Sequence, residues 1–413
     1  MFDLIKKPIT TSFAPNVQGD DVTLALQQVL SLMFKSKNNQ FINTLKEWFC
    51  SYYHVKHCFV FSSGRAALYY LLKSLNLEPG SEIVVQALTC VAVPNSIIWS
   101  GLKPVYVDVD KKTLNMDIDD LRKKISQKTK AIIIQHTFGI PAEIKMIKQI
   151  ADRNNLILIE DCAHSLGGTY QGQKLGSFGD VAFFSFGRDK MISSVFGGAI
   201  VTKNSSLAKK LAICENKLQQ TPKSFLVKQL LFNPIYYFSL LLYPIIIGRI
   251  IIKLCFKINL LSKAVYNEEK IGKMPQFIDY RFSPFLAKLA LNQLLKIDDF
   301  NQHRRQIADI YTKLIKSDNF GDEITIFLRY PILLNNKNHV LTQAKKNGIY
   351  LGDWYSTPIT PIKTDFNAFF YILDSCPNAE ELVHRLINLP THINIKPDEA
   401  KKICTFINSL SFK

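Results

Sequence analysis

Two hydrophobic periodicities alternate between residues 56 and 202, and this alternation constrains the fold more than any other feature of the chain. Helical patterns such as 65–75 and 141–153 separate the first five of seven short β-rich runs. Strands that alternate with helices predict a mostly parallel sheet covered by helices. The seven predicted strands are 58–62, 82–85, 104–107, 131–135, 156–160, 181–186 and 198–202.

The segments on either side complete an α/β organisation. Helices are expected at 22–34 and 41–52, and helical periodicity returns within 279–315. Residues 324–413 are typical of a small α+β domain, with a strand at 326–334, helices near 340–346 and 380–387, and a terminal helix. We therefore predict a large domain at 1–220, an apolar and basic helical insertion at 221–275, and a small C-terminal domain at 276–413.

The net charge and the cysteine pattern limit the classes of partner and cofactor that this protein is expected to bind. The 413 residues contain 51 Lys and Arg against 34 Asp and Glu, a formal net charge of +17 that favours anionic partners such as lipid or phosphorylated small molecules. No basic run resembles a nucleic-acid tail, so we expect no nucleic-acid partner. Eight scattered cysteines without a C-x-x-C motif predict neither a metal site nor a redox pair. The first 30 residues lack a secretory pattern, which favours a cytoplasmic location.

A candidate phosphate site follows the first predicted strand. Ser62, Ser63, Gly64 and Arg65 come directly after that strand and begin a helical pattern. Backbone N–H groups at the beginning of a helix bind phosphate, and a glycine permits its close approach. An ordinary strand–helix turn is the alternative interpretation of the same residues.

Two further positions supply candidate catalytic groups. Asp161 ends an apolar strand, where a carboxylate faces the crevice of a parallel sheet, although it could also be a helix N-cap. Ser185 and Lys190 follow another strand, and a lysine there forms a Schiff base if its pKa is lowered; a surface lysine is the alternative. A phosphate loop, then an acid, then a serine and a lysine is the order that a pyridoxal phosphate (PLP) site needs.

Longer motifs carry a family resemblance. The chain resembles the DegT/DnrJ/EryC1/StrS family of sugar aminotransferases, which implies the PLP fold type I with a seven-stranded, mostly parallel sheet. The matching segments are SSGRAAL (62–68), PGSEIVV (79–85), VAVPNSIIWSGLKPVYVDVD (91–110), QHTFGIP (135–141), LILIEDCAHSLGG (156–168), FSFGRDK (184–190), GGAIVT (197–202), DYRFSP (279–284), LNQLLKID (291–298) and RRQIADIY (304–311).

The resemblance implies roles for the matched positions. Lys190 would be the Schiff-base lysine, Asp161 would pair with the pyridine nitrogen, and His164 would lie near the cofactor's phenolic oxygen. His136 matches a family histidine below the site, for which we expect a structural role. The implied cofactor-binding residues are Ser63, Gly64, Arg65, Cys90, Asp161, His164, Ser185 and Lys190.

Three departures from the family pattern stand out. Cys90 replaces an aromatic residue that stacks on the cofactor, and Val195-Phe196 replaces a Gly-Glu pair. Asp279 stands where many members place an asparagine that reaches the phosphate in the neighbouring subunit. An acid near phosphate is repulsive unless Arg281 compensates for it.

The insertion contains 20 residues without a charge, from Gln229 to Gly248. This length suffices for a membrane span, but in the fold that the resemblance implies both flanks build one domain, and that fold excludes a single crossing. Pro234 and Pro244 are expected to interrupt a straight helix. The spacing of basic residues from 249 to 257 places them on one helix face, which predicts peripheral contact of 221–263 with the inner face of the cell membrane. A buried dimer contact is the alternative.

The resemblance implies a PLP-dependent aminotransferase that moves an amino group, expected from glutamate, to a nucleotide- or lipid-linked keto-sugar in polysaccharide or glycoconjugate synthesis. It also implies a homodimer with composite sites. One alternative is a sugar dehydratase of the same family, but those members replace the lysine by histidine, whereas Lys190 is present. The other alternative is a membrane-attached regulatory or scaffold protein with a degenerate site.

Overall fold

The computed structural model describes residues 7–12, 14–34, 39–315 and 320–411. Its centre is a seven-stranded sheet with the order β2-β11-β10-β7-β6-β3-β5. Neighbouring strands are parallel except at β11, which runs antiparallel to both β10 and β2. The strands are β2 (His57–Phe61), β3 (Glu82–Gln86), β5 (Lys103–Val107), β6 (Thr129–Gln135), β7 (Ile157–Asp161), β10 (Val181–Ser185) and β11 (Gly198–Thr202). All seven predicted strands are thus confirmed.

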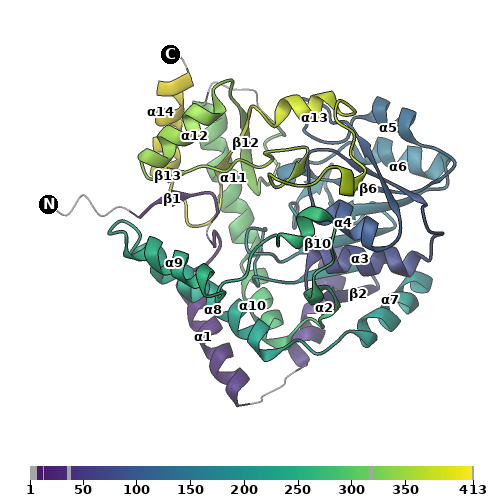
Figure 1. The fold of residues 1–413 in the computed structure, drawn as a ribbon, viewed down its shortest axis with the longest axis horizontal. Helices are drawn as coiled ribbons and strands as arrows, with labels where there is room; N and C mark the ends of the chain where they lie inside the picture. The colour runs from purple at the N-terminus through teal and green to yellow at the C-terminus, as the bar shows by residue number, and fades with distance from the viewer. Residues whose placement is uncertain (1–6, 13, 35–38, 316–319, 412–413) are drawn as a thin grey trace.

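Helices cover this sheet, as Figure 1 shows. They are α3 (Gly64–Leu75), α4 (Ala92–Trp99), α5 (Ile118–Lys124), α6 (Ile144–Arg153) and α7 (Ser205–Lys217). Local sequence sets where they begin. The side chains of Ser63, Asp117 and Asn204 accept hydrogen bonds from backbone N–H groups in the first turns of α3, α5 and α7, and such N-caps stabilise a helix by about 1 kcal/mol.

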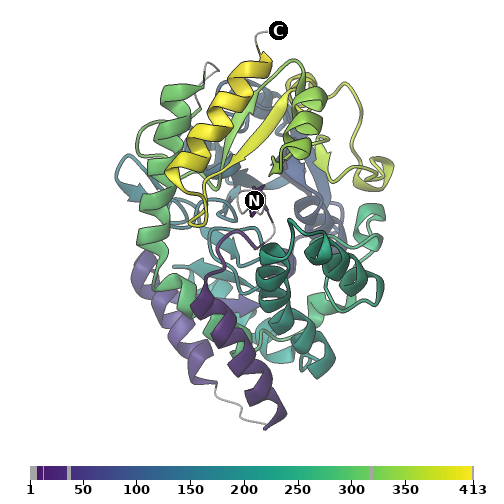
Figure 2. The ribbon, with the colours of Figure 1, turned by 90° about the vertical axis from the view of Figure 1, so that its left-hand side faces the viewer.

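The N-terminal helices α1 (Gly19–Met33) and α2 (Gln40–Tyr53) pack against α10 (Pro284–Leu294), which leads into the long α11 (Ile297–Leu314). Figure 2 shows α1 and α2, in purple, at the end of the molecule opposite the C-terminal helix α14 (Pro397–Ser411), in yellow. The helices predicted at 22–34, 41–52, within 279–315 and at the C-terminus are confirmed.

The C-terminal part is built on a small antiparallel sheet of β12 (Arg329–Leu333) and β15 (Leu386–Pro390), packed with α11, α12 (Lys337–Lys346) and α14. The helix predicted at 380–387 is wrong in its second half. α13 covers Pro377–Leu382, and the chain then extends into β15 because Leu386–Pro390 is entirely buried and pairs with β12 along its whole length.

Short elements connect these parts. β1 (Ile9–Thr10) pairs with β13 (Ile349–Tyr350), so the N-terminal stretch joins the C-terminal part. β4 (Thr89–Cys90) pairs with β14 (Ile359–Thr360), and β8 (Thr169–Tyr170) forms a hairpin with β9 (Gln173–Lys174). Short 3-10 helices lie at Thr137–Gly139, Glu268–Ile271, Gln276–Asp279 and Asn367–Phe369. The three-part domain division stays a prediction.

The apolar insertion forms two helices, α8 (Lys223–Leu241) and α9 (Ile247–Lys257). α8 packs lengthwise against α1 and buries Leu230, Phe232 and Tyr236. The predicted interruption at Pro234 is wrong because α8 continues through this buried proline. The missing N–H removes one helix hydrogen bond, whose loss the packing on α1 offsets. Pro244 lies in the turn between the two helices.

α9 lies outside the core, and Gly248 is its one residue that is fully buried. It projects at the left of Figure 1, beyond α8. Large apolar side chains at least one-third exposed gather here: Phe238, Leu241, Leu242, Ile245, Ile246, Ile247, Ile250, Leu254 and Ile258. Among the residues described, none of the helices has the length and hydropathy that crossing a bilayer requires.

Candidate active site

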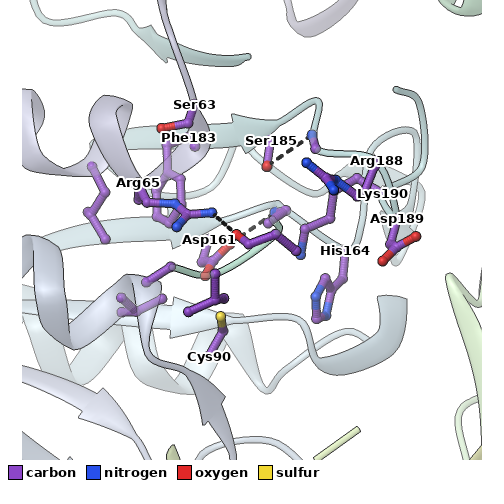
Figure 3. Close-up of a pocket in the computed structure, with 18 of the residues that line it drawn as sticks. Ser63, Arg65, Cys90, Asp161, His164, Phe183, Ser185, Arg188, Asp189 and Lys190 are labelled. Atoms are coloured by element: carbon purple, nitrogen blue, oxygen red, sulfur yellow. Dashed lines mark hydrogen bonds between the residues drawn. The ribbon is translucent and has the colours of Figure 1, made fainter. Parts of the chain in front are cut away.

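A pocket of about 120 Å³ lies at the carboxyl ends of β7 and β10, beside the N-terminus of α3. Figure 3 shows its side chains converging from these elements. All eight residues predicted to bind the cofactor line this pocket: Ser63, Gly64, Arg65, Cys90, Asp161, His164, Ser185 and Lys190. The fold therefore brings together residues that lie 127 positions apart or less in the chain.

Two glycines bring α3 against the sheet. A Cβ atom on Gly64 would lie 2.7 Å from Cβ of Ser185, and one on Gly198 would lie 2.7 Å from the backbone nitrogen of Gly64. Any larger residue at either position would push the helix away. The requirement for glycine explains how the beginning of α3 and Ser185 come to face one cavity.

The beginning of α3 fits a phosphate group. Ser63 caps the helix, since its Oγ accepts a hydrogen bond from the N–H of Ala66 at 3.1 Å. Over the described part of the chain, no oxygen accepts the N–H groups of Gly64 and Arg65. Free N–H groups at the positive end of a twelve-residue helix bind anions. The Ser185 hydroxyl lies next to them.

The Arg65 side chain is held by a later segment of the chain. Its guanidinium forms an ion pair with the buried carboxylate of Glu269 and donates a hydrogen bond to the backbone oxygen of Ala264 at 2.6 Å. Two of its donors are therefore engaged within the protein. The contribution of Arg65 that remains open to a phosphate is centred on its backbone N–H.

Asp161 ends β7 and is buried at the base of the pocket. Its Oδ1 accepts one hydrogen bond, from the N–H of Ala163 at 2.9 Å. Burial raises the pKa of Asp161, while that hydrogen bond and the charges of Lys190 and His136 act in the opposite direction. A buried carboxylate with a single hydrogen bond is suited to a cationic partner, and the protonated ring nitrogen of PLP is such a partner.

Lys190 lies in the loop after β10, and its backbone oxygen accepts a hydrogen bond from Nδ2 of Asn16 at 2.7 Å. Burial lowers the pKa of its amine and Arg329 acts in the same direction, whereas Cys90 and Asp161 oppose them. A lowered pKa increases the neutral fraction of the amine, which is the form that reacts with an aldehyde.

His164 contributes a neutral ring. Its Nδ1 accepts the N–H of Phe138 at 3.3 Å, which places the ring proton on Nε2. Burial lowers the pKa of His164 well below its usual range, and Lys190 and Arg329 add to this effect. The ring stacks against Phe138 and Trp354. His164 can thus donate a hydrogen bond without carrying a charge.

His136 lies behind the pocket with Glu160 and Cys162, and one potential ligand atom from each lies within 4.8 Å of the others. The side chains of His136 and Glu160 form their hydrogen bonds with other groups of this chain. Nδ1 of His136 accepts the N–H of Ala142, and its Nε2 lies 3.4 Å from Glu160. The Glu160 carboxylate also accepts three backbone N–H groups, from Gly176, Phe178 and Gly179. This geometry supports the structural role predicted for His136.

Sequence reasoning assigned no role to Arg188, although it lies inside the FSFGRDK motif. Its guanidinium donates hydrogen bonds to the backbone oxygen and Oγ of Ser262 at 2.6 and 2.8 Å, and it lies 4.2 Å from the ring centroid of Phe232 in α8. The departure at Phe196 belongs to the same contact, because its ring packs against Phe225, also in α8. The insertion therefore borders the pocket: Ala264 and Val265 line it, and α8 packs behind Arg188 and Phe196.

The C-terminal part supplies the opposite wall. Trp354 and Tyr355 line the pocket, and the Tyr355 hydroxyl accepts a hydrogen bond from Gln135 at 3.3 Å. Arg329 stacks on Trp354 at 4.0 Å. No local sequence pattern marks Arg329, a single arginine on a strand.

Asp279, predicted to reach a neighbouring subunit, accepts a hydrogen bond from the Tyr70 hydroxyl at 2.7 Å in this chain. The Arg281 guanidinium donates to the backbone oxygen of Asn216. No ion pair between Asp279 and Arg281 occurs among the described residues.

Comparison with known proteins agrees with this geometry. The sequence signature of the DegT/DnrJ/EryC1/StrS aminotransferase family matches residues 18–230 and 253–408. The unmatched stretch between them, 231–252, contains most of the exposed apolar residues of the insertion, whereas Leu254 and Ile258 lie within the matched range. The chain is 28% identical to GDP-perosamine synthase of Escherichia coli O157:H7 over 96% of this chain and 97% of that protein. It is 25% identical to the enzyme of the same name from Vibrio cholerae, over 96% and 98%.

Solved structures share the fold. PseC of Helicobacter pylori, an aminotransferase involved in the biosynthesis of pseudoaminic acid, has a TM-score of 0.74 at 22% identity and covers 98% of this chain and 99% of its own. NtdA of Bacillus subtilis with bound pyridoxamine phosphate has a TM-score of 0.73 at 20% identity, covering 99% and 86%. The PLP fold type I is confirmed. The chain belongs to the DegT/DnrJ/EryC1/StrS aminotransferase family, whose members are PLP-dependent enzymes.

Proposed function

We propose that this aminotransferase moves an amino group from glutamate to the keto group of a nucleotide-linked sugar. The observation that carries the proposal is the convergence of Lys190, Asp161 and the N-terminus of α3 on one pocket. The choice of a nucleotide-linked sugar rests on the relatives, since two GDP-perosamine synthases align with nearly the whole chain.

Each residue of the pocket has a distinct role in the proposed reaction. PLP, when bound, supplies a ring that accepts electrons from the substrate's α-carbon. Lys190 would hold the cofactor through its Nζ, and the same Nζ would carry the proton that the reaction moves. Asp161 would hold the protonated ring nitrogen of PLP, and His164 would offer its Nε2–H as a hydrogen-bond donor to the cofactor. The N–H groups of Gly64 and Arg65 orient the phosphate.

The two alternatives are less well supported. A sugar dehydratase would replace Lys190, which is present and has its pKa lowered by burial. A degenerate scaffold would have no need for the close glycine contacts at Gly64 and Gly198 or for the buried Asp161. Phe196 departs from the family pattern because it packs against Phe225 of the insertion.

The test uses the two half-reactions separately. Holoenzyme mixed with L-glutamate should form 2-oxoglutarate and lose the visible absorbance of PLP. GDP-perosamine is the product named for the relatives, so it should donate its amino group to the holoenzyme in the reverse of synthesis. The visible absorbance of PLP should then be lost, as it is with glutamate. Absence of exchange with both amines would refute the aminotransferase assignment, and exchange with glutamate alone would refute the GDP-sugar.

We also propose that the enzyme is a homodimer with composite sites, as the family resemblance at 279–281 implies. Asp279 begins that segment and accepts a hydrogen bond from the Tyr70 hydroxyl of α3. Light scattering on the holoenzyme should give twice the 47.1 kDa chain mass. A monomer that retains full activity would contradict composite sites.

A third proposal concerns the patch formed by the exposed residues of α8 and α9. We propose that this patch binds an anionic membrane surface without crossing the bilayer. Arg249, Lys253 and Lys257 are all exposed beside the apolar side chains. No Asp or Glu occurs between residues 216 and 267, so no acidic side chain of this segment repels lipid phosphates.

The orientation of α8 supports this proposal. Its buried face contains Gln229, Asn233 and Ser239, each with a side-chain atom that has no hydrogen-bond partner among the described residues, while Phe238 and Leu241 are more than half exposed. A helix whose outer face contacts only water would expose its polar side chains and bury its apolar ones. An apolar surface of this extent needs a partner.

A further inference from the structure

The loop that carries Lys190 has no regular secondary structure. Residues 186–197, all of which the structure describes, contain neither a helix nor a strand, so no ladder of backbone hydrogen bonds fixes the lysine. The backbone N–H of Lys190 donates to the oxygen of Gly187 at 3.1 Å, a contact within the loop itself. The position of the reactive amine therefore depends on side chains that hold the loop from outside.

Asn16 holds the loop at the lysine itself. Its Nδ2 donates hydrogen bonds to the backbone oxygens of Lys190 at 2.7 Å and of Met191 at 3.0 Å. In the part of the chain that the structure describes, no other donor reaches the Lys190 oxygen. Asn16 has no exposed surface, so water does not compete for these hydrogen bonds.

The orientation of the Asn16 amide is set by Arg304 of α11. Nη2 of Arg304 donates to Oδ1 of Asn16 at 2.8 Å. A guanidinium has only donors, so the amide must turn its oxygen toward Arg304 and its NH₂ group toward Lys190.

Arg304 has few other contacts. It is fully buried, and neither its Nε nor its Nη1 has a hydrogen-bond partner among the residues described. A longer contact joins its Nη2 to the backbone oxygen of Met191 at 3.4 Å. A buried charge is destabilising unless it is paired. The hydrogen bonds of this cation are made with Asn16 and with the loop of Lys190, which points to a role at that loop.

The segment that contains Asn16 is itself fixed. Nδ2 of Asn394 donates to the backbone oxygens on both sides of Asn16, at 2.8 and 3.0 Å. Gln293 of α10 joins the segment to the loop a second time, because its Oε1 accepts the N–H of Ser193 at 2.7 Å and its Nε2 lies 3.5 Å from the Asn16 oxygen. The segment before α1 is therefore a rigid support for the loop of Lys190.

We propose that Asn16, oriented by Arg304, is a positioning residue for Lys190. The proposal rests on the role of Lys190 in the proposed function. Asn16 contacts the backbone of the lysine and does not line the pocket. A displacement of a reacting group by about 1 Å can slow a reaction about 100-fold. Loss of the Asn16 contact should therefore slow the steps in which the Lys190 amine takes part and leave substrate binding unaffected.

Asn16→Asp tests this with the smallest change, because it exchanges only the NH₂ group for an oxygen. Arg304 keeps its acceptor and gains an ion pair, whereas the oxygens of Lys190 and Met191 lose their donor. In the holoenzyme, the half-reaction at saturating L-glutamate should slow about 100-fold, while the half-saturating glutamate concentration stays within about threefold of wild type. Attachment of PLP to cofactor-free full-length protein, followed by visible absorbance, should slow at least about tenfold.

Arg304→Met removes the group that orients the amide. The denaturation midpoint should stay close to that of the wild type, because the cost of burying an unpaired charge disappears together with its hydrogen bonds. Both rates should nevertheless fall about tenfold. Arg305→Met is the matched control. Arg305 is the next residue of α11 and is only half-buried, so its replacement should leave both rates at the wild-type level.

A double variant shows whether Asn16 acts through Lys190. Lys190→Ala with added methylamine, a soluble substitute for the missing amine, provides a slow half-reaction in which there is no lysine side chain to position. Addition of Asn16→Asp should change this rate by less than about threefold. An equal loss with and without the Lys190 side chain would overturn the proposal, since Asn16 would then act on the pocket as a whole.

The outcomes also separate this proposal from the proposed function. If the wild type attaches PLP but does not react with glutamate, the proposed function fails, while the attachment rates still decide the role of Asn16. Attachment and half-reaction rates in Asn16→Asp within about threefold of wild type would overturn the positioning role. If Asn16→Asp does not fold, wild-type rates in Arg304→Met would overturn it instead.

Discussion

The guanidinium of Arg65, in the first turn of α3, forms an ion pair with Glu269, a carboxylate with no exposed surface. The pair joins the α3 end of the pocket to the chain that returns from the insertion. A second carboxylate contact strengthens the junction, because the other oxygen of Glu269 accepts the N–H of Tyr266 at 2.7 Å. The return of the chain from α9 is thus fixed at the cofactor site.

Glu269→Gln should therefore destabilise the protein. The variant leaves Arg65 without its counter-charge, and we expect the free energy of unfolding to fall by roughly 3 kcal/mol, the lower end for a buried pair, because Arg65 keeps a little exposure. Chemical denaturation measures the change. The exposed neighbour Glu268 provides the control, since Glu268→Gln should leave stability within about 0.5 kcal/mol. Equal stability of the two variants would contradict this account.

Lys190→Ala should abolish transamination while the fold stays intact. Removal of the amine eliminates both the attachment of PLP and the proton transfer, and proton transfer alone contributes about 10²–10⁴-fold. Spectrally monitored half-reactions with glutamate measure the loss, and circular dichroism checks the fold. Lys190→Arg, which keeps the positive charge, should be equally inactive. Turnover by either variant would remove Lys190 from the catalytic role.

Asp161→Asn should act in opposite directions on the two forms of the protein. Burial raises the pKa of Asp161, so the ionised group costs stability once the pH exceeds its unfolded value. The neutral amide should therefore raise the melting temperature of the cofactor-free protein at pH 7. In the holoenzyme it should weaken PLP binding and lower activity, because the ring nitrogen loses its anionic partner. Near-normal activity would reduce Asp161 to a structural cap.

Buried histidines should make the protein sensitive to mild acid. Burial lowers the pKa of His392 to about 3, and its Nε2 lies 2.7 Å from the backbone oxygen of Thr10. The unfolded chain binds the proton first as the pH falls below about 6.5, so stability present above that pH is lost. From pH 7.5 to pH 5, the loss due to His392 is about 2 kcal/mol.

Denaturation at the two pH values provides the comparison. His392→Gln keeps a donor for Thr10 but does not titrate, so it should lose about 2 kcal/mol less than the wild type over this range. The exposed His384, changed to Gln, is the control and should follow the wild type. A pH dependence identical in His392→Gln and wild type would show that this histidine is protonated in the folded state.

The patch on α8 and α9 predicts binding to anionic vesicles. Full-length protein should sediment with phosphatidylserine-containing vesicles and far less with neutral ones. Combined replacement of Arg249, Lys253 and Lys257 by Gln should weaken binding by about 100-fold, at about 1 kcal/mol for each charge. Replacement of Ile250 and Leu254 by Ser should also release the protein. Ile213→Ser, at an exposed apolar position of α7, is the control.

Two results would contradict this prediction. Failure of the wild type to bind any vesicle would exclude the membrane. A change of oligomeric state in the Ile250 and Leu254 variant would instead assign the patch to a contact between copies of the chain.

The pocket's large-domain side could be predicted from sequence because strand ends mark it. Asp161 and Ser185 are the last residues of β7 and β10. In each case the change from apolar to polar residues marks the end of the strand in the sequence. The α3 end of the pocket could be predicted in the same way, since α3 begins at Gly64, only two residues after the end of β2. Local order along the chain was therefore enough to group these residues.

The opposite wall could not be predicted in this way. Arg329 and Trp354 reach Lys190 through the packing of the C-terminal part, and no local pattern records that contact. Local reasoning also failed at 380–387, where pairing of β15 with β12 overrides a helical pattern. At Pro234, packing against α1 outweighs a residue that ordinarily ends a helix.

The contacts of Arg188 divide the insertion into an inner and an outer part, and deletion of each part should affect the active site differently. Phe232 and Ser262 hold the Arg188 side chain two residues from Lys190, so a cut that removes them would disturb the active site. A shorter cut, replacing 241–258 by a Gly/Ser linker able to cover the ~16 Å length of α9, removes only the outer part. Loss of the outer part should therefore leave catalysis intact, whereas loss of the inner part should impair it, because only the inner part holds Arg188.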